Sequence, residues 1–165
     1  HRDLHSFPTR RSSDLEELKS ILAEKEAIFK RAFLDGETVK ENPKMELVII
    51  AALRRIIAAR EAGGGASSLA EIQGIRLGDL EILASGFEVF QAIKNDVLAK
   101  AAGPKTFFAG ISNDTKGYAV DRRKASEGGY AARTVPWIMG SDPYQDIHGE
   151  LAAALLELSS SLASA

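Results

Sequence analysis

The stretch IQGIRLGDLEILASGFEVF (residues 72–90) contains two short apolar runs on either side of Gly78-Asp79. The apolar side chains of these runs are Ile72, Ile75, Leu77, Leu80, Ile82 and Leu83. Runs of this kind favour strands, and a glycine between them supplies the positive φ that tight hairpin turns require. We therefore predict a two-stranded hairpin that turns at Gly78-Asp79.

The residues after the hairpin predict a helix and then a strand. Apolar residues recur at helical spacing over residues 89–101, and Gly103-Pro104 ends that pattern. The short apolar run 106–111 is bounded by turn residues, which is typical of a buried strand.

The last third of the chain predicts a loop and a terminal helix. Residues 112–141 are rich in glycine and polar side chains and are expected to be mostly irregular. A terminal helix is expected over residues 142–160, beginning at Asp142-Pro143, with a frayed tail at 159–165. The hairpin, helix, strand and loop would then form a core over residues 70–141.

Two amphipathic helices are predicted over residues 16–62. The first covers residues 16–34 and ends at Asp35-Gly36. The second begins at Asn42-Pro43, a cap followed by a proline, and stops at Gly63–Gly65. The whole pattern predicts an α+β fold with helices packed on a short hairpin and one further strand.

The first fifteen residues, HRDLHSFPTRRSSDL, resemble the in-frame translation of a short-read sequencing adapter. Segments that do not belong to the natural protein are set aside before the fold is considered. We therefore expect the natural chain to begin no later than Glu16 and to be the C-terminal part of a larger domain. The alternative is a natural arm rich in arginine and serine.

Composition excludes several classes of function. The net charge of −2 becomes −3 without residues 1–15, because three arginines and two aspartates lie there. This mildly acidic balance gives no basic footprint, so no nucleic-acid partner is expected. The chain has no cysteine, which excludes disulfides and thiolate metal sites. No apolar run is long enough to span a bilayer, so no transmembrane segment is expected.

Four short motifs follow one another along the chain: Arg76-Leu77-Gly78-Asp79, Gly86-Phe87-Glu88-Val89-Phe90, Asn113-Asp114-Thr115-Lys116-Gly117-Tyr118 and Gly128-Gly129-Tyr130. In the order and spacing of these motifs, residues 70–160 resemble the C-terminal part of the catalytic domain of neutral/alkaline, non-lysosomal ceramidases. The corresponding motifs of that family are approximately R-I-G-D, P-G-E-x-F, N-x-Y-x-G-Y and G-G-Y, in the same order. The resemblance implies a zinc-dependent hydrolase that cleaves the N-acyl bond of ceramide.

The resemblance also implies the metal ligands. They are two histidines from the upstream part of the domain, a glutamate that falls on Glu88 and a tyrosine whose position falls on Thr115. A carboxylate is a suitable ligand for an open zinc site, where zinc lowers the pKa of bound water and polarises a carbonyl. Asn113, Asp114 and Tyr118 are further candidates for the wall of this site.

The chain departs from the family pattern where the metal would bind. Gly86 and Phe87 replace the proline and glycine before the glutamate, and Thr115 offers a short hydroxyl instead of a phenol. His148, the only histidine after residue 15, lies outside the family's motifs. We therefore expect this chain to bind no zinc and to be inactive by itself. Its expected partner is the missing N-terminal part of the same domain.

The candidate residues also have structural interpretations. Glu88 precedes a predicted helix, where a carboxylate interacts favourably with the helix dipole. Asp79 and Asn113 are interpreted as turn residues. His148 is interpreted as a solvated or hydrogen-bonded residue near a helix start.

Three functions from different classes follow from the sequence. The first is a ceramidase-like amide hydrolase acting on an acyl-amide or lipid-like small molecule, to which this chain contributes one wall of the site. The second is a non-catalytic binding or structural relative of the same fold, which Phe87 and Thr115 favour. The third treats residues 16–62 as an interaction hairpin, which should bind a partner or self-associate when expressed alone.

Overall fold

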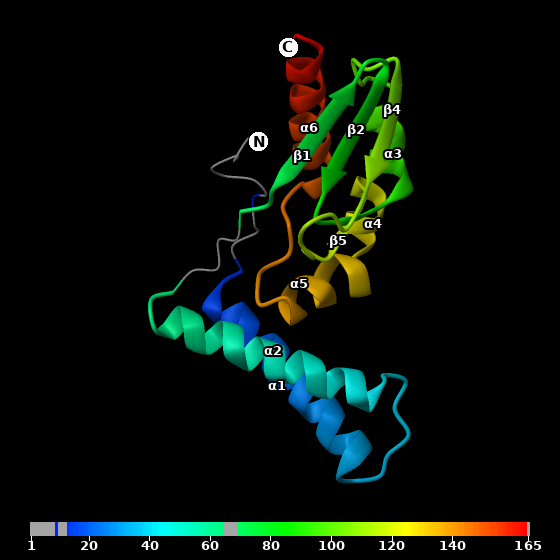
Figure 1. Ribbon diagram of the computed structural model, residues 1–165. Coiled ribbons are helices and arrows are strands. Elements are labelled where there is room, and N and C mark those ends of the chain that lie inside the picture. The colour runs from blue at the N-terminus through cyan, green and yellow to red at the C-terminus, as the bar shows by residue number, and fades with distance from the viewer. Residues whose placement is uncertain (1–8, 10–12, 65–68, 165) are drawn as a thin grey trace. The chain divides into compact units, whose positions relative to one another are not determined.

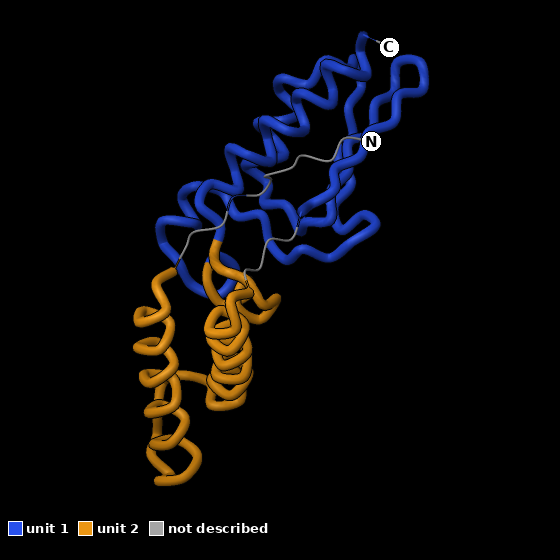
Figure 2. The backbone as a smooth tube through the Cα atoms, turned by 90° about the vertical axis from the view of Figure 1, so that its left-hand side faces the viewer, with its two compact units in different colours: residues 1–9, 68–132, 144–165 blue, residues 10–67, 133–143 orange. Residues whose placement is uncertain are grey.

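The computed structural model describes residues 9, 13–64 and 69–164. It contains 52% helix and 15% strand with a small mixed sheet, which confirms the predicted α+β class. The chain divides into two compact units, coloured separately in Figure 2. We call residues 10–67 and 133–143 the helical unit, and residues 1–9, 68–132 and 144–165 the sheet unit.

Two long helices, α1 (Leu15–Phe33) and α2 (Pro43–Glu61), make up most of the helical unit (Figure 1). The Asn42 side chain accepts a hydrogen bond of 3.1 Å from the backbone N–H of Lys44, which confirms the predicted cap. Asp14, from the adapter-like segment, caps α1 in the same way. The core of this unit consists of Leu18, Ile49, Ala52, Leu53, Ile56, Ile57 and Trp137.

The predicted hairpin is present as β1 (Ile72–Leu77) and β2 (Leu80–Ser85), which pair antiparallel. Gly78 has a φ of +60° at the first position of the two-residue turn, a conformation that favours glycine. The predicted further strand is present as β4 (Lys105–Ala109), which pairs in parallel with β2 and gives the order β1-β2-β4. The expectation that this strand is buried is wrong, since none of its residues is buried and Phe107 is exposed. Parallel neighbours need a crossover connection, and it contains α3 (Gln91–Leu98).

One face of the sheet is covered by helices (Figure 1). The terminal helix α6 (Ile147–Ala163) packs on β1 and against α3. It lies so close to β1 that a Cβ on Gly74 would be 2.6 Å from Leu162 Cδ1. The opposite face exposes Ile75, Leu77 and Phe107, because side chains alternate along each strand. The core beneath the helices consists of Ala70, Ile72, Leu83, Phe87, Val89, Ile93, Val97, Ala119, Val120, Ile147, Leu151, Ala154, Leu155 and Leu158.

The prediction that residues 112–141 are mostly irregular is wrong. They contain β5 (Tyr118–Ala119), α4 (Arg122–Glu127), the π-helix η1 (Tyr130–Thr134) and α5 (Val135–Ile138). These elements are too short for a hydrophobic period to be visible in the sequence. The helix predicted over residues 89–101 is shorter than expected, because Val89 belongs to a separate strand, β3 (Glu88–Val89).

The terminal helix does not begin at Asp142-Pro143, as the sequence suggested. It begins at Ile147, because the side chain of Asp146 caps it by accepting a hydrogen bond of 3.1 Å from the backbone N–H of Gly149. The carboxylate of Asp142 is instead engaged by Arg60 within the helical unit. Of these two aspartates, only Asp146 caps α6.

The prediction of a frayed tail at residues 159–165 is also wrong, since α6 continues to Ala163. Ser159 is fully buried and its Oγ lies 3.0 and 2.9 Å from the two carboxylate oxygens of Glu81, in β2. Thr106 Oγ1 donates a further hydrogen bond of 3.0 Å to Glu81. This buried polar cluster holds the last turns of α6 on the sheet.

Candidate functional site

Two of the sequence motifs meet in the short parallel strand pair of β3 and β5, where Glu88 lies opposite Tyr118. The backbone N–H of Glu88 donates to the carbonyl of Gly117 over 2.9 Å, and that of Phe90 donates to Ala119 over 3.0 Å. Sequence reasoning missed this pair, because two residues are too few to show the alternation of a strand. The pairing brings a carboxylate and a phenol from distant motifs side by side.

The loop before β5 is held against the connection between β2 and β3. The backbone N–H of Lys116 donates to the carbonyl of Gly86 over 2.8 Å, and that of Ser112 donates to Ser85 over 2.9 Å. A Cβ on Gly86 would lie 3.0 Å from Asp114 Cβ, so a glycine permits this close approach. The second and third motifs are therefore parts of one local structure.

Phe87 anchors this structure in the core of the sheet unit. Its side chain is fully buried, and its ring meets that of Tyr144 edge to face with 5.7 Å between centroids. Successive side chains of an extended segment point to opposite sides, so the next residue, Glu88, is directed outward and is exposed. Phe87, which stands where the family motif has a glycine, thus packs in the core and leaves the Glu88 carboxylate accessible.

An aromatic cluster adjoins the Glu88 carboxylate. The rings of Phe90 and Tyr118 are 6.0 Å apart with an interplanar angle of 84°. The rings of Tyr118 and Tyr130 are 6.4 Å apart at 65°. Tyr130 belongs to the fourth motif, so three of the four motifs converge on this place. Neither the contact of Phe90 nor that of Tyr130 was predicted, because nothing local in the sequence signals it.

Glu88 changes the electrostatics of its neighbour. The negative charge of Glu88, together with partial burial and the nearby Tyr130 phenol, raises the pKa of Tyr118. Deprotonation would place a second negative charge next to the first, which is unfavourable. Glu88 therefore favours the protonated form of the Tyr118 phenol.

The other candidates of the third motif form the loop rather than the strand pair. Asn113 adopts a left-handed φ of +62° and its amide nitrogen donates to the Gln73 side chain, which agrees with a turn residue. Asp114 accepts a hydrogen bond of 2.7 Å from the backbone N–H of Thr115 and pairs with Lys116 over 2.8 Å. The Lys116 ammonium lowers the pKa of Asp114. Thr115 itself is exposed.

The first motif lies at the other end of β2 from the Glu88 strand. Arg76 Nε donates to the carbonyl of Gly78 over 3.3 Å, and the carbonyl of Asp79 accepts from the backbone N–H of Lys105 over 3.2 Å. Asp79 is a turn residue, as predicted. The structure therefore does not bring this motif to the candidate site.

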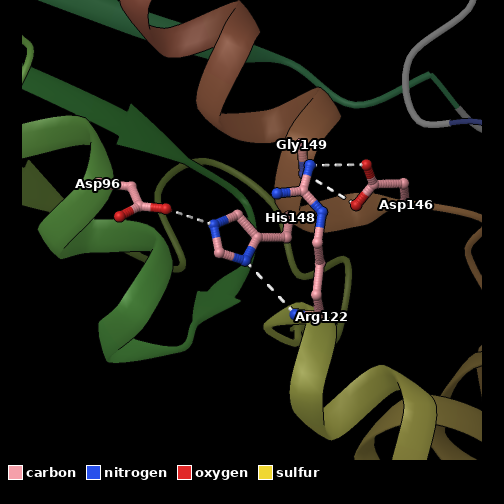
Figure 3. A network of polar contacts seen from close by, with 5 residues as sticks. All are labelled: Asp96, Arg122, Asp146, His148 and Gly149. Carbon is pink, nitrogen blue, oxygen red and sulfur yellow. Dashed lines mark hydrogen bonds and ion pairs between the residues drawn. The ribbon is translucent and has the colours of Figure 1, made fainter.

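His148 is a hydrogen-bonded structural residue, as predicted (Figure 3). Its Nε2 lies 2.8 Å from Asp96 Oδ2, and its Nδ1 accepts a hydrogen bond of 3.4 Å from the backbone N–H of Arg122. The Arg122 guanidinium pairs with Asp146 over 2.9 Å and lowers the pKa of that carboxyl group. Both nitrogens of the imidazole are occupied in joining α3, α4 and α6.

The donor set of the candidate site is incomplete for a zinc ion. Within the parts of the chain that the structure describes, no three side chains of His, Cys, Asp or Glu are grouped so that they could hold a metal. Glu88 and Tyr118 supply two oxygen donors, whereas catalytic zinc sites use three protein ligands. These residues do not fit zinc by themselves.

Comparisons with protein-family models, curated proteins and solved structures gave no match to this chain. Over residues 9, 13–64 and 69–164, no helix combines the length and hydropathy needed to cross a bilayer.

Replacing Glu88 by glutamine is expected to lower the pKa of Tyr118 toward that of a free phenol. Because the raised pKa favours the protonated phenol in the folded state, its contribution to stability is complete below a pH of about 10 and is lost as pH rises through the folded-state pKa. An NMR titration of the tyrosine rings measures this directly. Glu17→Gln, on α1, is the control and should leave the titration unchanged. A Tyr118 that titrates identically with and without Glu88 would contradict the interaction.

Proposed function

We propose that this chain forms one wall of the active site of a ceramidase-like, zinc-dependent amide hydrolase and is inactive by itself. One observation supports the proposal: three motifs of the resemblance, separated along the chain, converge at the pair Glu88 and Tyr118. Convergence of this kind is what a site requires, since function depends on local groups rather than on the fold.

In this proposal Glu88 supplies a carboxylate oxygen to the metal and Tyr118 supplies a phenol oxygen. Tyr118 takes the role that the motif alignment assigns to Thr115, because Tyr118 is the residue opposite Glu88. A bound zinc ion would lower the pKa of a water molecule and polarise the amide carbonyl. Phe87 holds the Glu88 segment in place, and Gly86 lets the loop 113–117 close against it.

The remaining ligands belong to polypeptide outside this chain. The proposal requires two histidines in an upstream part of the same domain, which is the expected partner. The substrate is an acyl amide or a lipid-like small molecule with an amide bond. The identity of the acyl chain depends on residues of that upstream part.

The test begins with the source DNA upstream of Glu16. We expect an open reading frame that supplies two histidines, and the joined protein is expected to bind one zinc ion and hydrolyse an N-acyl sphingoid substrate. Glu88→Gln and Tyr118→Phe should each weaken zinc binding or activity by roughly 100-fold, whereas Glu17→Gln should not. Full zinc content and activity in both site variants would contradict the assignment.

A non-catalytic relative of the same fold is the second candidate. It is favoured by the exposed hydroxyl of Thr115 at the position where the family has a tyrosine ligand. This alternative predicts an upstream reading frame in which both histidines are replaced. The joined protein would then bind no zinc but would still contain the strand pair of Glu88 and Tyr118.

A further inference from the structure

We infer that Glu88, Phe90, Tyr118 and Tyr130 form a binding site for an organic trimethylammonium group, such as that of choline. The four residues come from β3, the segment before α3, β5 and the start of η1, all within the sheet unit. This inference goes beyond the proposed hydrolase, because it concerns the chain as it stands and requires no zinc.

Three aromatic rings adjoin one another at this place, with ring centroids 6.0 and 6.4 Å apart. The rings of Phe90, Tyr118 and Tyr130 pack edge to face, with interplanar angles of 84° and 65° between successive rings. The face of each ring carries the negative part of its quadrupole and attracts a cation. Tyr130 is 53% exposed, so the cluster is accessible from solvent.

Glu88 forms no ion pair with any described residue. Two other carboxylates of the sheet unit, Asp114 and Asp146, pair with Lys116 and Arg122. Among the described residues, no lysine, arginine or histidine forms an ion pair with Glu88. The negative charge of Glu88, next to the Tyr118 ring, attracts a cation and repels an anion.

The donor chemistry selects a quaternary cation over a primary ammonium ion. A primary ammonium group has three N–H donors that water hydrates strongly, and contact with a ring face removes part of this hydration. The site offers a single carboxylate, which also interacts with the Tyr118 hydroxyl. A trimethylammonium group has no N–H to satisfy, so ring faces and one charge are sufficient.

The test is an NMR titration of the full chain with choline, followed through the ring signals of Phe90, Tyr118 and Tyr130. We expect saturable shifts of these signals at millimolar choline. The neutral isostere 3,3-dimethylbutan-1-ol, which has the same shape without the charge, should bind at least tenfold more weakly. Equal binding of the two compounds would overturn the inference, because it would show an apolar site without charge selectivity.

Variants with matched controls separate the site from the rest of the molecule. Glu88→Gln should weaken choline binding about fivefold, and Tyr130→Leu about threefold. Both residues are exposed, so these variants are expected to fold. The controls Glu17→Gln and Phe33→Leu remove an exposed carboxylate and an exposed ring elsewhere and should not change the affinity. Unchanged affinity in both site variants would overturn the inference.

The source of the trimethylammonium group is settled by comparing free choline with phosphatidylcholine vesicles. Binding to choline, with or without the vesicles, supports the inference and shows whether a free molecule or a lipid head group is accepted. Binding to the vesicles without binding to choline would overturn it. Failure of choline binding would leave the hydrolase proposal intact, since that proposal depends on the upstream histidines and on zinc.

Discussion

Replacing Phe87 by alanine is expected to lower the free energy of unfolding of the sheet unit by about 4 kcal/mol. The ring is fully buried and packs edge to face on Tyr144, so its removal loses apolar burial and leaves a cavity. The neighbouring Glu88 would also lose its anchor. The variant should therefore weaken binding at the candidate site as well as stability.

Native-state amide hydrogen exchange measures this effect in each unit separately. The slowest amides of β2 report on the sheet unit, and those of α2 report on the helical unit. Phe107→Ala is the matched control, because it removes the same ring from the exposed face of the sheet and should cost less than about 1 kcal/mol. Similar losses in the two variants would show that Phe87 does not anchor the core.

Replacing Glu81 by alanine is expected to cost about 3 kcal/mol in the same unit. Glu81 is fully buried and accepts hydrogen bonds from Ser159 and Thr106. Without the carboxylate, the buried Ser159 hydroxyl loses its acceptor, whereas Thr106 keeps the carbonyl of Gly103. Glu81→Gln should lose less, because the amide keeps one acceptor oxygen for the hydroxyl groups.

A double-mutant cycle with Ser159→Ala tests whether the two residues act together. The losses from Glu81→Ala and Ser159→Ala should be less than additive, because each removes the same interaction. Exchange at the end of α6 should increase in both variants. Lys100→Ala, an exposed residue of the same unit, is the control and should have no such effect. Additive losses would mean that Ser159 and Glu81 stabilise the fold independently.

The two proposed roles of Glu88 are mutually exclusive at any one moment. A carboxylate that ligates zinc has its charge neutralised and attracts an organic cation less strongly. Zinc bound by the joined hydrolase is therefore expected to weaken choline binding, whereas this chain alone should bind choline regardless of zinc. The two ligands thus report on two states of the same residue.

The candidate site was predictable only in part from the sequence. The resemblance pointed to Glu88 and to the segment 113–118, and both take part in the local structure. The strand partner of Glu88 is Tyr118 rather than Thr115, and this depends on the register of a two-residue pair. Registers of such short pairs leave no periodic trace in the sequence.

The sequence by itself determined the elements whose signals are local. Asn42-Pro43 marks the start of α2, and Gly78-Asp79 marks the hairpin turn, because a cap and a positive φ depend only on adjacent residues. Tertiary structure alone decided where α6 begins and ends. Asp142 and Asp146 are both suitable caps, but Asp146 caps α6 whereas Asp142 pairs with Arg60, far away in the chain.

The same reason explains the polar cluster and the aromatic site. Ser159, in the tail that was predicted to fray, becomes buried because its partner is Glu81. Glu81 lies in β2, 78 residues earlier in the chain. Tyr118 becomes a neighbour of Glu88 only when β3 and β5 pair, and Tyr130 in turn contacts Tyr118. Interactions between residues close in sequence are encoded in composition and spacing, whereas contacts between distant residues exist only after the chain has packed.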